Sequence, residues 1–252
     1  MAVGLGDLST ILKATEIEQL PDFIEAHRVD ERAGVLSLVA KAKKRLVAHQ
    51  AEIDRTEHMK RYEREYSDFG AICGIDEVGR GPLAGPVVAG AVILPKECQI
   101  LYLNDSKQLS EKRREELYDI IMAEALAVGI GYASPERIDE INILNATYEA
   151  MRAAIGQLTV VPDLLLNDAV TIPQVAIRQV PIISGDAKSI SIAAASIVAK
   201  VTRDRLMVQY DELFPEYGFA AHKGYGVPVH IEAIREWGPT PIHRRCFIKN
   251  FI

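Results

Sequence analysis

The chain of 252 residues contains few cysteines, no long apolar run and no excess of positive charge. Its three cysteines, Cys73, Cys98 and Cys246, are odd in number and form no Cys-x-x-Cys pair. A disulfide framework and a zinc site are therefore not expected, and the pattern favours a reducing compartment. No apolar stretch is long enough to predict a transmembrane helix.

The first residues of the chain also lack the basic region and apolar core of a signal peptide. We therefore expect a cytoplasmic protein without a membrane contact. The formal net charge of −6 argues against a surface coated with positive charge. Nucleic acid stays open as a partner, because its binding requires only a local basic face. The length allows one or two domains, and the sequence shows no internal repeat.

Residues 1–66 are poor in glycine and rich in Glu, Lys, Arg, Ala and Leu, unlike the rest of the chain. Their apolar residues keep helical spacing, and Asp30 is placed to cap a helix that runs to about Arg64. Eight basic and four acidic residues between Lys41 and Arg64 leave a local excess of +4. This excess indicates either a solvated helix face or a phosphate-binding arm. We predict a helical amino-terminal extension, residues 1–66, as a candidate substrate-binding arm.

Residues 67–252 have the pattern of an α/β domain that ends in a helical segment and a tail. Short apolar runs predict strands at 71–77, 86–94, 128–133, 164–166 and 174–183. Helices are predicted at 110–126, 134–158 and 229–237, with Ser110 and Ser134 as N-caps of the first two. Residues 187–200 are small and apolar on nearly every side, which predicts a buried helix packed closely on the sheet.

Four acidic residues share one pattern, because each follows an apolar strand and precedes a turn: Asp76, Glu77, Asp168 and Asp186. Strand ends converge in α/β sheets, so these carboxylates are expected at one site. They would repel each other without a cation, and oxygen ligands favour Mg²⁺ or Mn²⁺ over zinc. Such a cluster is what two-metal phosphodiester hydrolysis requires. The alternatives are a solvated hairpin tip for Asp76 and Glu77, and a helix N-cap for Asp186.

Several motifs together resemble the signature of bacterial ribonuclease HII, of the type 2 ribonuclease H family. They are GIDEVGRGPLAG at 74–85, NDSK at 104–107, GDAK at 185–188 with SIVAK at 196–200, and HKGYG at 222–226. The resemblance covers about residues 70–247 in the family's order. It implies a ribonuclease H-like mixed five-stranded sheet flanked by helices, with three antiparallel strands at its start.

The resemblance also implies residue roles. The four acids would be the metal-binding catalytic residues. Gly79, Arg80 and Gly81 match the turn whose backbone reads the ribose 2′-hydroxyl, which is the local mark of RNA. Tyr225 matches the tyrosine that packs on the deoxyribose 3′ of the ribonucleotide. Candidates for phosphate contacts are the basic residues Lys107, Lys188 and Arg203.

The activity implied by the resemblance is that of a Mg²⁺- or Mn²⁺-dependent endoribonuclease. It would act on RNA–DNA hybrids and would cut 5′ of single ribonucleotides embedded in duplex DNA, as in ribonucleotide excision repair. The products would be 3′-hydroxyl and 5′-phosphate ends, and we expect a monomer. A nuclease that needs runs of ribonucleotides and a non-catalytic hybrid-binding module are the alternatives.

Two features depart from the pattern or lie outside it. Asn167 stands where a small apolar residue is expected before the third acid, and we expect its amide to solvate the strand end rather than to reach water at the metal. The apolar end, residues 247–252, is a candidate contact for a partner such as a replication clamp. Packing on its own domain is the preferred interpretation.

Overall fold

The computed structural model describes residues 3–252, and the chain divides into two compact units between His58 and Met59. The division precedes the predicted boundary at 66/67. No helix within the described residues is both long and apolar enough to cross a lipid bilayer.

The amino-terminal unit is helical, as predicted. It contains α1 (Leu5–Ala14), η1 (Ile17–Gln19), α2 (Leu20–Ala26) and most of α3 (Ala33–Met59). Its core consists of apolar side chains from these helices: Leu8, Leu12, Leu20, Phe23, Val35, Leu38, Val39 and Ala42. The predicted helix from Asp30 to Arg64 is wrong at both ends. Asp30 lies before α3 and pairs with Arg32, and a second helix, α4 (Arg61–Glu65), follows α3.

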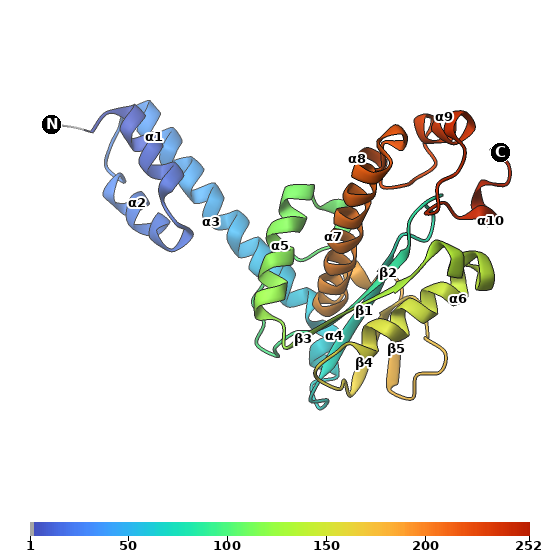
Figure 1. Cartoon of the computed structure of the whole chain (residues 1–252). Helices are drawn as coiled ribbons and strands as arrows, with labels where there is room; N and C mark the ends of the chain where they lie inside the picture. The colour runs from blue at the N-terminus through green and yellow to red at the C-terminus, as the bar shows by residue number, and fades with distance from the viewer. Residues whose placement is uncertain (1–2) are drawn as a thin grey trace. The chain divides into compact units, whose positions relative to one another are not determined.

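The second unit is built on a five-stranded sheet in the order β3-β2-β1-β4-β5 (Figure 1). β1 (Ile72–Val78), β2 (Val87–Ile93) and β3 (Ala127–Ala133) are antiparallel neighbours. β4 (Leu164–Asp168) and β5 (Arg178–Ile182) continue the sheet in parallel with β1. The mixed sheet with three antiparallel strands at its start is therefore confirmed.

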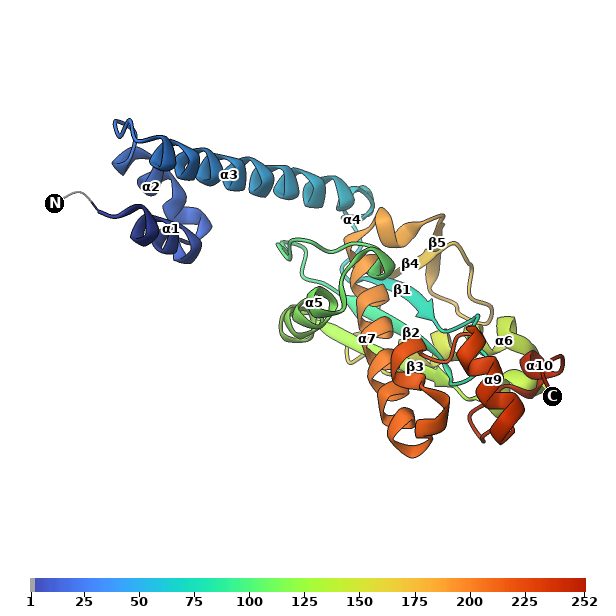
Figure 2. The same ribbon diagram turned by 90° about the horizontal axis from the view of Figure 1, so that it is seen from above.

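Two long helices cover the two faces of this sheet (Figures 1 and 2). α7 (Ile190–Leu213) packs on β1 and β2, and α6 (Pro135–Gly156) packs on β2 and β3. The contacts are so close that a Cβ at Gly74 would lie 2.0 Å from the Ser191 backbone, and one at Gly131 would lie 1.9 Å from Ala150 O. The predicted small, buried helix is thus confirmed. It begins at Ile190 rather than 187, because η3 (Gly185–Ala187) precedes it.

The remaining helices of this unit are α5 (Glu111–Glu124), η2 (Ser106–Gln108), η4 (Pro215–Tyr217), α8 (Phe219–His222), α9 (Pro228–Trp237) and α10 (Arg245–Ile248). Ser110 and Ser134 cap α5 and α6 as predicted. Phe247 and Phe251 pack against a buried cluster that contains Ile248. The tail therefore packs on its own unit, which was the preferred interpretation.

Helix α4 belongs to the second unit by its contacts. Tyr62 and Tyr66 pack against buried residues of β4, among them Leu164. Glu63 Oε1 accepts hydrogen bonds from Ser189 Oγ at 2.5 Å and from Ser191 N at 3.1 Å. This carboxylate therefore supports the N-terminus of α7 together with the N-cap serine.

Candidate active site

Four acidic side chains gather where three neighbouring strands end. Asp76 and Glu77 lie at the carboxyl end of β1. Asp168 ends β4, and Asp186 follows β5 in η3. These strands are adjacent and parallel, so their carboxyl ends meet at one edge of the sheet. The structure therefore brings together the four acids that the sequence singled out.

The acids are buried enough to disfavour their charged forms. Burial is the main cause that raises the pKa of Asp76 well above its usual range, and the charge of Glu77 adds to it. Burial also raises the pKa of Glu77, against the opposing effect of the Arg80 guanidinium, whose Nη1 lies 3.3 Å from Glu77 Oε1. At Asp186 burial again raises the pKa, followed by the charge of Asp105. Keeping several ionised carboxylates here is costly unless a cation compensates them.

The donor set fits a hard divalent cation, although its members do not form a closed cage. Among residues 3–252, no three His, Cys, Asp or Glu side chains converge closely enough to hold an ion as they stand. Asp76 Oδ1 instead accepts a hydrogen bond from Glu77 N at 2.8 Å, and Asp168 Oδ1 accepts one from Gly185 N at 2.7 Å. Repulsion between carboxylates is a physical reason for this spread. The fit to Mg²⁺ or Mn²⁺ rests on the oxygen ligands and on the cost of their uncompensated charge.

Both alternative explanations of the acids disagree with the geometry. Asp76 is only 5% exposed and pairs with Gly90 inside the sheet, so it is not part of a solvated hairpin tip. Asp186 does not cap α7, because the N-cap is Ser189, whose side chain accepts a hydrogen bond from Ile192 N.

The role predicted for Asn167 from the sequence is wrong. Its side chain is fully buried, and its Nδ2 donates to Gln179 Oε1 at 2.8 Å and to Val170 O at 3.1 Å. Successive strand residues point to opposite faces, so Asn167 lies on the sheet face opposite to Asp168. It therefore neither solvates the strand end nor reaches the acids, and it holds the loop after β4.

The Gly-Arg-Gly turn lies directly after the first two acids and faces Tyr225. Gly79 has φ +87°, and a Cβ there would lie 2.2 Å from Arg203 Nε, so only glycine fits. A Cβ at Gly81 would meet only Tyr225 Cε1, at 3.9 Å. The ring of Tyr225 therefore lies directly beside the turn, on the side where Gly81 has no side chain. Tyr225 as a residue is 42% exposed.

The three basic candidates differ in their placement. Burial acts to lower the pKa of Lys107, but the charges of Asp105 and Asp76 outweigh it and raise that pKa, which places the ammonium in the field of the acids. Lys188 is exposed, and its Nζ donates to Ile183 O at 2.6 Å. Arg203 is fully buried and donates only to backbone carbonyls, so its prediction as a phosphate contact is corrected.

A pair of histidines behind Tyr225 was not predicted from the sequence. Thr240 N donates to His243 Nδ1 at 2.9 Å, so the ring proton of His243 lies on Nε2. That nitrogen lies 3.0 Å from His230 Nε2, which must accept, and His230 Nδ1 then donates to Tyr225 O at 2.9 Å. Burial lowers the pKa of both rings to about 4, which keeps them neutral. The chain of hydrogen bonds has one direction and ends on the backbone of Tyr225.

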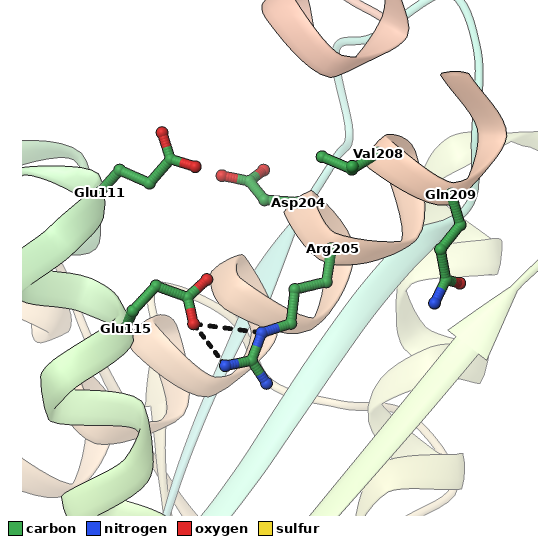
Figure 3. A pocket seen from close by; sticks show the side chains of 6 residues that line it. All are labelled: Glu111, Glu115, Asp204, Arg205, Val208 and Gln209. Carbon is green, nitrogen blue, oxygen red and sulfur yellow. Dashed lines mark hydrogen bonds and ion pairs between the residues drawn. The ribbon is translucent and has the colours of Figure 1, made fainter. Parts of the chain in front are cut away.

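A hollow of about 340 Å³ lies between α5 and α7. Figure 3 shows its lining side chains, among which Arg205 pairs with Glu115. The lining residues are Glu111, Glu115, Asp204, Arg205, Val208 and Gln209. None of the acids described above lines this hollow. It is therefore separate from the candidate active site.

Comparison with known proteins gives one family over nearly the whole chain. The family model of Ribonuclease HII matches residues 73–250, and that of the Ribonuclease HII N-terminal domain matches residues 6–67. The chain is 67% identical to Ribonuclease HII of Lachnoclostridium phytofermentans over 90% of this chain and 89% of the relative. It is 53% identical to that of Clostridioides difficile over 98% and 97% of the two chains.

Two solved structures share the fold of most of this chain. Ribonuclease H2 from Pyrococcus horikoshii superimposes with a TM-score of 0.60 at 27% identity, over 72% of this chain and 96% of the other. The RNase HII of Archaeoglobus fulgidus, solved in a complex with PCNA, gives 0.59 at 29% identity, over 71% and 96%.

Proposed function

Because the chain belongs to the ribonuclease HII family, we propose that it cuts the RNA strand of RNA–DNA hybrids and cuts 5′ of single ribonucleotides embedded in duplex DNA. The observation that carries this proposal is the position of the four acids beside a Gly-Arg-Gly turn that faces Tyr225. An acidic site alone would serve many phosphodiester substrates. The adjacent turn and ring supply a place where the sugar is read.

The four acids would hold Mg²⁺ or Mn²⁺, in a two-ion arrangement. Such ions activate water and stabilise the charge that builds on the phosphate and the leaving oxygen. The chain itself contributes a buried, oxygen-lined edge of the sheet, in which the Ser196 hydroxyl donates to the carboxylate of Asp76 and its Oγ lies 3.0 Å from Ser106 Oγ. Attack on the phosphate 5′ of the ribonucleotide would leave 3′-hydroxyl and 5′-phosphate ends.

The sugar would be read from two sides. The backbone of Gly79, Arg80 and Gly81 would bond the 2′-hydroxyl, because glycine permits close approach of main-chain donors and acceptors. The ring of Tyr225 would pack on the following deoxyribose, where a 2′-hydroxyl would be crowded. The closeness of the ring to the turn supports this assignment, because a Cβ at Gly81 would lie 3.9 Å from Tyr225 Cε1.

Phosphate contacts are assigned to Lys107 and Lys188. For the amino-terminal unit we retain a weaker proposal of duplex contact through Lys41, Lys43 and Lys44, which are exposed on α3. Arg45 is excluded from that set, because its guanidinium donates to Leu12 O and Thr15 O at the end of α1.

The proposed setting is a cytoplasmic monomer in ribonucleotide excision repair. A clamp contact through the carboxyl tail is not favoured, because Ile248 is fully buried within the tail's own unit. The PCNA complex of the archaeal relative is the reason to test a clamp at all.

A cleavage assay tests the proposal. The substrates are a DNA duplex with one ribonucleotide and an RNA–DNA hybrid, each with Mg²⁺ or Mn²⁺, for the wild type and Asp76→Asn. A cut on the 5′ side of the ribonucleotide that disappears in the variant supports the acids and the sugar reading together. Cleavage of the hybrid alone would favour the alternative that needs runs of ribonucleotides. Binding of both without any cut would favour a non-catalytic module.

A further inference from the structure

Two arginines are buried behind the Gly-Arg-Gly turn, and neither pairs with a carboxylate among residues 3–252. Arg203 and Arg244 are both 0% exposed. All six hydrogen bonds of their guanidinium groups go to backbone carbonyls. Five of the six acceptors belong to the single segment 79–86. The two side chains thus enclose that segment from its buried side.

Arg244 contacts the turn itself. Its Nη2 donates to Gly79 O at 2.5 Å, its Nη1 to Arg80 O at 2.9 Å and its Nε to Gly85 O at 2.9 Å. The planar guanidinium fork presents several donors in a fixed geometry, which one ammonium group does not. Arg244 therefore fixes two successive peptide groups of the turn at once.

Arg203 joins the same segment to the loop that carries Tyr225. It donates to Ala84 O at 3.0 Å, to Pro86 O at 2.9 Å and to Lys223 O at 2.9 Å. Leu83 N also donates to Gly224 O at 2.8 Å. The turn and the tyrosine loop are therefore one connected unit.

Buried cations without carboxylates are expensive. Burial lowers the pKa of Arg203 to about 10 and that of Arg244 to about 9. An apolar side chain of similar volume would avoid this cost of desolvation. Their presence therefore indicates a requirement for the backbone geometry that they impose.

That geometry decides where the turn's N–H groups point. In a planar trans peptide the C=O and N–H bonds point in opposite directions. Because the carbonyls of Gly79 and Arg80 point to the buried Arg244, the N–H groups of Arg80 and Gly81 point away from it. Successive N–H groups on one side form a concave site for an oxygen ligand, and a cation behind them adds positive potential.

We propose that Arg244 is a positioning residue that sets the selectivity of the turn for a 2′-hydroxyl, and that Arg203 couples this turn to the Tyr225 loop. The inference rests on the proposed function and deepens it. It names a residue outside the Gly-Arg-Gly motif, 163 positions after Gly81 in the sequence (244 − 81), that decides how the motif presents its donors.

The test is a ratio of affinities. Two DNA duplexes differ only in one ribonucleotide or deoxynucleotide, and their Kd values are measured in an Asp76→Asn background that cannot cleave. Arg244→Lys keeps a charge but cannot span three carbonyls, so the preference for the ribonucleotide duplex should fall about tenfold. The deoxynucleotide duplex should change by less than about twofold. Arg152→Lys is the control, since Arg152 is only partly buried and donates to Pro173 O, away from the turn.

The outcomes separate the two proposals. An unchanged ratio with folded Arg244→Lys protein would show that Arg244 only supports the fold, and would overturn the inference while the function stands. If the Asp76→Asn protein with Arg244 intact binds the two duplexes equally well, both the inference and the proposed function are overturned. If Arg244→Lys does not fold, the amide resonances of the protein that keeps Arg244 test the inference instead. The N–H signals of Arg80 and Gly81 should shift with the ribonucleotide duplex and not with the other, and equal shifts would overturn the inference.

Discussion

Gly185 donates its backbone N–H to Asp168 Oδ1 at 2.7 Å. Gly185 directly precedes Asp186, so this bond ties the acid at the end of β4 to the acid after β5. A Cβ at Gly185 would lie 2.5 Å from Ile192 Cδ1 on α7. The spacing between the third and fourth acids is therefore set by a close contact of backbone, carboxylate and helix.

Replacing Asp76 with Asn should abolish cleavage and stabilise the metal-free protein. Burial and the charge of Glu77 raise the pKa of Asp76, so an ionised Asp76 destabilises the folded, metal-free protein. The neutral amide of asparagine avoids this destabilisation. We expect a rise in Tm of about 2–4 °C in EDTA. Mn²⁺ should then raise the Tm of the wild type more than that of the variant. Equal Mn²⁺ effects would contradict a metal role for this acid.

Alanine at Gly79 and at Gly81 should have opposite consequences. Gly79→Ala forces a Cβ to 2.2 Å from Arg203 Nε at φ +87°, so we expect a loss of about 2 kcal/mol or more in the free energy of unfolding. Gly81→Ala meets only the ring of Tyr225 at 3.9 Å, so its stability should stay within about 0.5 kcal/mol of the wild type. Its cleavage of a single-ribonucleotide duplex should still fall about tenfold, because the new methyl group would lie against the Tyr225 ring, where the sugar is expected to pack. Full activity of Gly81→Ala would remove the turn from substrate contact.

Tyr225 should act through its ring rather than through its hydroxyl. The residue is 42% exposed and its ring lies beside the turn, and stacking on a sugar needs only the flat face of the ring. Tyr225→Phe should therefore keep cleavage within about threefold, and Tyr225→Ala should lower it about tenfold or more. The ratio of cleavage at a single ribonucleotide to cleavage within a run should fall only in the alanine variant. A large loss in Tyr225→Phe would assign the function to the hydroxyl instead.

The His230–His243 pair should make folding sensitive to mild acid. Both pKa values fall to about 4 in the folded protein, from an ordinary value of 6.5, so the unfolded chain binds more protons between these limits. The stability is present above about pH 6.5 and is lost as the pH falls toward 4, by about 4 kcal/mol for the pair between pH 7 and 5.

Urea unfolding at several pH values checks this prediction, followed by the fluorescence of the single tryptophan, Trp237, on α9. The acids with raised pKa values act in the opposite sense, so the comparison is between variants. The free energy of unfolding of His243→Asn should depend less on pH than that of the wild type. His58 is exposed, so His58→Asn should keep the pH dependence of the wild type. Parallel curves for all three proteins would contradict the pair's role.

Two truncations should separate the amino-terminal unit from helix α4. Residues 59–252 retain Glu63, which accepts from Ser191 N and Ser189 Oγ, whereas residues 67–252 lose it. We expect the longer fragment to fold and cleave, and the shorter one to lose about 2–3 kcal/mol of stability. Thermal unfolding and cleavage of the same hybrid compare them. Equal stability would show that α4 contributes nothing to the second unit.

The same fragments also test the proposed contact of the amino-terminal unit with the duplex. Loss of residues 1–58 should weaken hybrid binding and flatten its dependence on salt, because fewer phosphates are neutralised. A triple change of Lys41, Lys43 and Lys44 to Gln in the full chain is the matched comparison. Unchanged binding in both proteins would discard the arm.

Much of the site was accessible from the sequence, because its signals are local. Acids after apolar strands, glycines around a turn and a helix of small residues each report the immediate backbone environment. The periodicity predicted all five strands, and the serine caps of α5 and α6 were correct. The resemblance supplied the order of the motifs and the expected roles.

Contacts between distant segments were decided only by the tertiary structure. Arg203 looked like a surface cation, and Asn167 like a solvated amide, because sequence spacing does not show which face of an element is covered. Folding turns Asn167 to the opposite side from Asp168, and it buries Arg203 against the carbonyls of a turn more than a hundred residues away. The sequence by itself determined which groups are expected to carry the chemistry. The tertiary structure decided which groups hold them in place, because a buried donor must find its acceptor wherever packing brings one.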